Sequence, residues 1–136
     1  MKDLYHGSKV VPAFGPIVRP AGAGIAVDLQ GFESALFVFQ SGAMGAVAGT
    51  YTWKLTESIA SGGPYTDVAG GDMVGGVTTV VFDQAVGGDA NMAKKLGYIG
   101  SKQFIKVFST EGTAGTPTSI VGASAVLGNP RHAPVV

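Results

Sequence analysis

Residues that could act as general acids or bases are few in this sequence and far apart along the chain. The two histidines, His6 and His132, lie near opposite ends, and the nine acidic residues are scattered. Acid–base catalysis needs titratable groups that converge in one pocket. The histidines would meet only if the two chain ends pair in one sheet. We therefore expect no enzyme activity, no metal site and no cofactor.

Two aspartates, Asp72 and Asp89, each follow a Gly-Gly pair, a pattern that also occurs in calcium-binding repeats. The regular period of those repeats is missing here. A short polar side chain after such a pair commonly bonds the backbone of its own tight turn. We expect this turn role for both aspartates, and a calcium ion at a junction between subunits is the alternative.

The one cluster of basic residues in the sequence consists of Lys94, Lys95, Lys102 and Lys106. We expect a solvated strand edge that lysines protect from pairing with other chains, and a surface for an acidic partner is the alternative. The whole chain has nine basic and nine acidic residues, so its formal net charge is zero. Nucleic-acid binding depends on concentrated positive charge, so no nucleic-acid partner is expected.

Four aromatic residues, Phe37, Phe39, Tyr51 and Trp53, could line a sugar-binding face. From residue 47 to residue 56, however, the odd positions are apolar or glycine and the even positions are mostly polar. This alternation predicts a half-buried strand with Tyr51 and Trp53 on its inner face. We expect all four aromatic side chains to form a buried core, and a carbohydrate-binding sandwich is the alternative.

Further strands are predicted where β-branched and aromatic residues cluster. The strongest patterns cover residues 77–82, 104–108 and 119–127, and weaker ones cover 9–11, 25–29, 65–68 and 95–99. Residues 35–39 (ALFVF) are apolar on both faces, which predicts a strand covered above and below. Residues 89–96 could instead form two helical turns capped by Asp89.

Residues 34–53 carry no charge and are long enough to span a bilayer. Their polar residues and period-two alternation predict two strands and a turn instead, so no membrane partner is expected. Charges in the first six residues also argue against a secretory signal.

Glycine- and proline-rich turns separate the predicted strands, for example at residues 22–24, 61–64 and 112–117. The sum is an all-β fold, an antiparallel β-sandwich of jelly-roll type with about seven to nine short strands. We expect one domain over residues 1–136, with an N-terminal arm at 1–11 and an extended C-terminal segment at 129–136. A closed barrel is the alternative, because the pattern leaves the strand order open.

The composition favours assembly with other protein molecules. Only 13% of the residues are charged, and the chain has 22 glycines and no cysteine. A neutral, weakly charged surface does little to repel copies of itself. We therefore expect a protein that is packed against neighbours.

Several segments resemble a family of small structural proteins of tailed bacteriophages and prophages, encoded beside the major capsid protein. They are MKDLYH at 1–6, KVVPA at 9–13, DLQGFESA at 28–35, GYIGSK at 97–102, FIKV at 104–107 and GNPRHAP at 128–134. The resemblance implies a virion protein, with capsid cement (decoration) protein as the leading role. It also implies a β-sandwich on the outside of the head, commonly a trimer, assembled in the host cytoplasm. A neck, head–tail connector or tail component is the alternative.

Such a protein would bind the major capsid protein and other copies of itself. The segments expected to make these contacts are the chain ends, because proline favours an extended form that can lie along a neighbour. The residues expected at the interface are Met1, Lys2, Asp3, Leu4, Tyr5, His6, Asn129, Pro130, Arg131 and His132.

Overall fold

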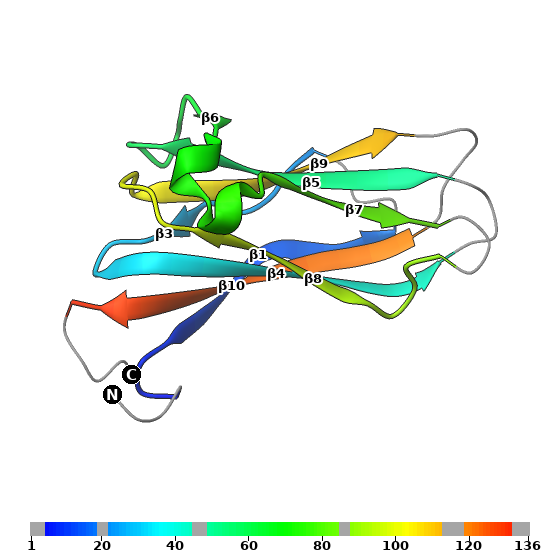
Figure 1. The fold of residues 1–136 in the computed structure, drawn as a ribbon, viewed down its shortest axis with the longest axis horizontal. Coiled ribbons are helices and arrows are strands. Elements are labelled where there is room, and N and C mark those ends of the chain that lie inside the picture. The colour runs from blue at the N-terminus through cyan, green and yellow to red at the C-terminus, as the bar shows by residue number, and fades with distance from the viewer. Residues whose placement is uncertain (1–4, 19–21, 45–48, 85–87, 113–118, 132–136) are drawn as a thin grey trace.

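Two antiparallel sheets packed face to face make up nearly all of the computed structural model, which describes residues 5–18, 22–44, 49–84, 88–112 and 119–131 (Figure 1). The strands are β1 (Lys9–Val18), β2 (Gly22–Ala23), β3 (Val27–Asp28), β4 (Phe32–Met44), β5 (Thr50–Ser58), β6 (Thr66–Asp67), β7 (Thr79–Asp83), β8 (Ala93–Tyr98), β9 (Phe104–Gly112) and β10 (Ser119–Pro130). Two single-turn 3-10 helices, η1 (Gly70–Asp72) and η2 (Val74–Gly76), lie between β6 and β7.

The strand order is that of a jelly roll. Sheet A has four strands in the order β1-β10-β4-β8, and sheet B is centred on β9 and β5. The short strands β2 and β3 pair with the outer edge of β9, while β6 and β7 pair with the outer edge of β5. Every pairing is antiparallel. The predicted antiparallel sandwich is confirmed, and the two separate sheets exclude the closed barrel.

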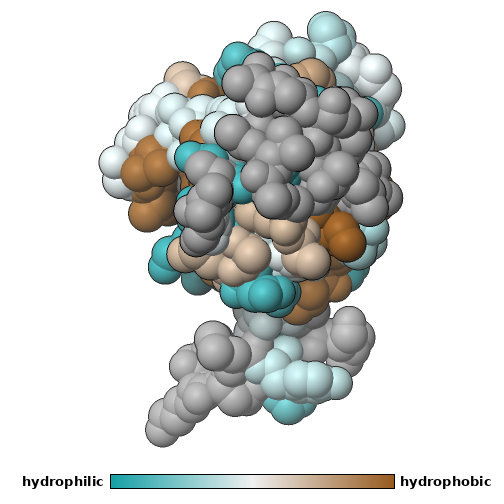
Figure 2. Space-filling view, turned by 90° about the vertical axis from the view of Figure 1, so that its right-hand side faces the viewer, coloured by the Kyte–Doolittle hydropathy of each residue, from teal (hydrophilic) through white to brown (hydrophobic). Residues whose placement is uncertain are grey.

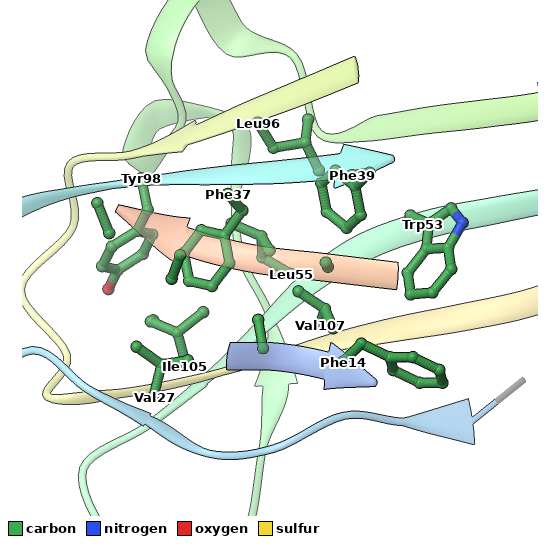
Figure 3. Packing of buried hydrophobic residues seen from close by; sticks show 14 of the residues in the cluster. Phe14, Val27, Phe37, Phe39, Trp53, Leu55, Leu96, Tyr98, Ile105 and Val107 are labelled. Carbon is green, nitrogen blue, oxygen red and sulfur yellow. The ribbon is translucent and has the colours of Figure 1, made fainter. Parts of the chain in front are cut away.

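The core lies between the sheets and follows the predicted alternation. On β5, Tyr51, Trp53 and Leu55 are buried, and the alternating positions of β10 from Val121 to Leu127 are buried against them. Large aromatic side chains fill the layer in Figure 3. The ring of Trp53 meets that of Phe14 edge to face, with centroids 4.9 Å apart. The predicted half-buried strand is therefore confirmed as β5, which begins at Thr50.

The prediction for residues 35–39 is wrong in one respect. Phe37 and Phe39 are fully buried, but Leu36 is 37% exposed and Val38 is half-buried. Sheet A is an outer layer of the sandwich, so the described chain covers only one face of β4. Its second apolar face lies on the surface.

Two further predictions need correction. Residues 89–96 do not form a helix, because β8 begins at Ala93 and pairs with the central strand β4. Gly22–Ala23, predicted as part of a turn, forms the short strand β2 at the edge of β9. In both places pairing with a neighbouring strand outweighs the local pattern.

The β1 side of the sandwich is closed by direct backbone contacts between the sheets. The N–H of Ile25 donates to the carbonyl of Ala13 and the N–H of Gly24 donates to the carbonyl of Val107, each at 2.8 Å. A β-carbon at Gly24 would collide with the Ala13 carbonyl. Only glycine allows this approach.

Candidate interaction surfaces

The described residues nearest the two chain ends lie at one end of the sandwich because β1 and β10 are paired strands. Lys9 at the start of β1 lies opposite Leu127 near the end of β10. Figure 1 shows the start of β1 below the two layers, beside the end of β10. In Figure 2 this region is a narrow extension below the body, and its coloured residues are pale to teal, the hydrophilic end of the scale.

Five of the ten residues predicted at the interface are described. Tyr5 is 81% exposed and packs edge to face on His6, with ring centroids 5.1 Å apart. His6 is also exposed. The predicted residues Met1, Lys2, Asp3, Leu4 and His132 lie outside the described part of the chain, so a meeting of the two histidines stays a prediction.

The C-terminal members of the set are held by the sandwich. Asn129 and Pro130 belong to β10, and the Asn129 side chain donates to the Ser34 hydroxyl at 3.1 Å. The backbone N–H of Arg131 donates to the Gly31 carbonyl at 2.8 Å. Arg131 is exposed, so its guanidinium is presented from a fixed backbone.

A polar hollow of about 530 Å³ lies beside Arg131. Its wall is ordered by Asp28, which accepts hydrogen bonds from the backbone N–H of Gln30 at 2.9 Å and from the Gln103 amide at 3.0 Å. The lining residues are Leu29, Gln30, Phe32, Glu33, Gly100, Ser101, Lys102, Gln103 and Arg131. Sequence reasoning identified Arg131 but not the hollow, because the other residues come from the start of β4 and from segments around residues 29–30 and 100–103, which are distant in the sequence.

The outer face of sheet A carries a row of apolar residues that crosses all four strands. In register order the row runs from Val10 through Val126 and Leu36 to Gly97. The side chain of Val74 lies over Gly97, in the space that a β-carbon there would fill. Val10 is 67% exposed and Val74 is 57% exposed. We call Val10, Val126, Leu36 and Val74 the apolar ridge.

Charge is almost absent from this face. Among the described outward-facing strand residues of sheet A, only Lys95 is charged, and it lies on the edge strand β8. The outer face of sheet B differs, since Lys54 forms an ion pair with Asp67 at 2.8 Å. Lys106 on the same face lies over the ring of Tyr65 at 4.7 Å. Exposed ion pairs add little stability, but they keep this face hydrated, so the two outer faces suit different environments.

The four lysines do not form the predicted single edge. The Lys94 ammonium donates to Asp89 at 2.8 Å and to the Val81 carbonyl, and lies 5.0 Å from the centre of the Phe82 ring. Lys94 thus closes the sandwich between β8 and β7. Lys95, Lys102 and Lys106 lie on the face of sheet A, at the polar hollow and on sheet B, respectively.

Asp89 also departs from its predicted role. Its carboxylate accepts a hydrogen bond at 3.0 Å from the N–H of Asp83, six residues earlier, as well as one from Lys94. The hydrogen bond from Lys94 lowers the pKa of Asp89 most, and the bond from the Asp83 N–H lowers it further, so this pKa lies below its ordinary value. The carboxylate therefore joins two strands instead of closing its own turn. No three His, Cys, Asp or Glu side chains of the described residues gather in a group that could hold a metal ion.

The four aromatic residues considered for sugar binding are all buried. Phe37, Phe39, Tyr51 and Trp53 have no exposed surface, as the core prediction requires. The indole N–H of Trp53 has no hydrogen-bond partner among the described residues. These rings therefore offer no platform to a sugar.

Comparisons with known proteins add little to this picture. No protein-family model and no curated protein matches the chain. A solved structure to which it is similar is that of Eiger TNF from S. frugiperda, with 9% identity, 93% of this chain and 87% of that chain covered, and a TM-score of 0.35. In the described part of the chain, no helix is long and apolar enough to cross a membrane.

Proposed function

We propose that the protein is a structural virion protein of a tailed phage, a cement (decoration) protein that binds the exterior of the head. In this role it binds the major capsid protein, associates with copies of itself, as a trimer, and bridges neighbouring capsid subunits. The sequence resemblance suggests this role. The observation that carries it is the almost uncharged, apolar outer face of sheet A on a chain of zero net charge.

A clamp of this kind works by many modest contacts. Packed DNA pushes the subunits of a head apart, and a protein bound across several subunits resists their separation. Each contact can be weak because the others keep the local concentration high. The paired chain ends suit this role, since Tyr5, His6 and Arg131 are exposed on backbone that β1 and β10 position together.

The jelly-roll fold is compatible with this role but does not establish it. The fold occurs in viral capsid proteins and also in lectins, and function depends on the surface that a fold presents. The burial of Trp53 and its neighbours removes the residues on which the carbohydrate-binding alternative depended.

The experiment that tests the proposal is quantification and localisation of the protein in purified virions. A cement protein is present in a number of copies similar to that of the major capsid protein, and an image reconstruction shows it on the outside of the head. Few copies at the neck or tail would favour the connector alternative. Absence from the virion would overturn the proposal.

Heads that lack the protein provide the functional measurement. We expect them to lose DNA at a lower temperature than complete heads, and added purified protein should restore their stability. Survival equal to that of complete heads would contradict a stabilising role. The added protein must be shown to bind in the same assay, so that loss of binding and loss of stabilisation are distinguished.

A further inference from the structure

We propose that the outer face of sheet A is a self-complementary interface, to which a second copy of this chain binds about a two-fold axis. The inference depends on the pattern, shape and charge of this face and not on the proposed function. The proposed trimer closes about a threefold axis and uses a different surface from a two-fold contact. A capsid lattice contains axes of both kinds, so the two contacts can coexist.

The first argument is the sequence pattern of β4. A strand with apolar residues on both faces is normally covered on both faces. The inner residues Phe37 and Phe39 are fully buried by sheet B, whereas Leu36 remains 37% exposed on the outer side. Within one chain, the described residues cover this outer face only in part, since Val74 lies over Gly97 beside Leu36 and Val38 is half-buried.

The second argument is the shape of the face. The apolar ridge crosses it near one end of the strands, and a hollow of about 390 Å³ lies toward the other end. Gly122 and Gly42 line the hollow, where Pro16 and Ile120 pack close to their α-carbons. A β-carbon at Gly122 would lie 3.0 Å from Pro16. The lining residues are Phe14, Pro16, Val38, Gln40, Ser41, Gly42, Asn91, Ile120, Gly122, Ala123 and Ser124.

Ridge and hollow are related by the register of the sheet. Leu36 of the ridge and Gln40 of the hollow lie four positions apart on β4, which corresponds to about 14 Å along a strand. Midway between them, Val38 is paired with Ser124 of β10. A two-fold axis in the plane of the interface along this middle row places the ridge of each copy over the hollow of the other. Such exchange of contacts defines an isologous interface.

The third argument is the charge of the face. A second copy presents the same almost uncharged surface, so binding does not require the removal of water from ion pairs on either partner. The axis brings Lys95 of each copy near Lys95 of the other at the rim, because Lys95 lies in the middle row opposite Val38. This like-charge contact weakens the pair, and salt screens it.

The size of the face sets the strength of the contact. The four strands lie side by side over the stretch from Ala35 to Gln40 of β4. At a strand spacing of about 4.8 Å and a rise of about 3.3 Å per residue, this stretch gives roughly 380 Å² per partner. A stable interface buries about 800 Å² per partner. We therefore expect a dimer that dissociates on dilution and becomes important only where copies are concentrated, as on an assembled surface.

The experiment is sedimentation equilibrium of the full chain over a wide concentration range. We expect a reversible step that doubles the mass, either monomer to dimer or trimer to hexamer. This step should be at least tenfold weaker for Leu36→Lys and unchanged for the control Val81→Lys. Leu36 and Val81 are similarly exposed, at 37% and 40%, on the outer faces of sheets A and B. Thermal unfolding checks that both variants fold. A native chain that shows no doubling of its mass, or a doubling step that Leu36→Lys leaves intact, overturns the proposal.

Two further variants test the axis itself. Lys95→Gln should tighten association, and added salt should tighten it in the native chain but much less in this variant. Because the chain has no cysteine, Ser124→Cys can be cross-linked specifically by a short bis-maleimide. We expect cross-linked dimers for Ser124→Cys and far fewer for Thr52→Cys on sheet B. Equal yields from the two variants would refute the assigned axis.

Discussion

The hydroxyl of Tyr98 donates a hydrogen bond to the Glu57 carboxylate at 2.7 Å and thereby joins β8 of sheet A to β5 of sheet B. The same hydroxyl accepts a bond from the N–H of Lys102 at 3.0 Å. Figure 3 shows the hydroxyl of Tyr98 and the indole of Trp53 at opposite ends of the core. Burial, and then the bond to Glu57, raise the pKa of Tyr98 above its ordinary value. The phenol therefore stays protonated and acts as a structural donor.

Removing this hydroxyl should destabilise the fold. We expect Tyr98→Phe to lower the free energy of unfolding by about 1.5–3 kcal/mol, the usual contribution of a hydrogen bond to a charged group. Denaturant unfolding measures the change. The control is Tyr65→Phe, which removes an exposed bond to the Ser61 carbonyl and should cost less than about 1 kcal/mol. Equal losses of unfolding free energy in the two variants would show that the Tyr98–Glu57 hydrogen bond stabilises the fold no more than an exposed hydrogen bond does.

The ion pair between Lys94 and Asp89 should make stability depend on pH in the acidic range. The pKa of Asp89 is depressed in the folded chain, so its contribution is complete above its ordinary pKa of 3.8 and is lost as the pH falls through the folded value. We expect Asp89→Asn to be less stable than the native chain by about 1 kcal/mol at neutral pH. This difference should shrink below about pH 4. A difference that is constant with pH would contradict the assignment.

The emission of the single tryptophan should report its burial. Trp53 is fully buried, so we expect blue-shifted fluorescence that iodide does not quench and that mono- or oligosaccharides do not change. Trp53→Ala should cost about 3–5 kcal/mol of unfolding free energy. Quenching by iodide in the folded chain, or a spectral response to a sugar, would contradict this description of the core.

A residue's burial could be predicted where the pattern of its own strand determines it, and could not be predicted where it depends on which strands become neighbours. Period-two alternation correctly predicted the buried faces of β5 and β10, because those faces pack against the opposite sheet. The pattern of β4 predicted apolar contacts for Leu36 but could not show whether the cover comes from the same chain or from another. Local patterning also could not show that the Lys94 ammonium meets the Val81 carbonyl, because this contact depends on β7 and β8 becoming neighbours.

The candidate surfaces were predictable to a smaller extent. Prediction of the chain ends as a contact region rested on the extended form that prolines favour. The structure brings the described parts of both ends together through the pairing of Lys9 with Leu127. The apolar ridge could not be predicted, since Val10, Val126 and Val74 are separated in sequence and become neighbours only through strand register. The hollow beside Arg131 is assembled from loops in the same way.

Glycine at position 24 should be required for closure of the β1 side. A methyl group there would meet the Ala13 carbonyl and the Val107 side chain, so we expect Gly24→Ala to cost about 1–3 kcal/mol of unfolding free energy. Gly15→Ala is the matched control, because no atom lies within 4 Å of the added carbon. It should change stability by less than about 0.5 kcal/mol. A tolerated Gly24→Ala would mean that the two sheets can separate at this edge without loss.

The role of the N-terminal segment can be separated from the stability of the sandwich. β1 begins at Lys9, and Tyr5 and His6 are exposed, so replacing residues 2–6 with a Gly/Ser sequence should leave the midpoint of thermal unfolding nearly unchanged. If the segment is a contact arm on the head, the same variant should bind purified heads at least tenfold more weakly, measured by co-sedimentation. Leu36→Lys serves as the comparison, because it changes the outer face of sheet A and leaves the N-terminal segment intact. Full binding of the N-terminal variant would refute the arm, while loss of binding together with a lower unfolding temperature would show that the segment supports the fold instead.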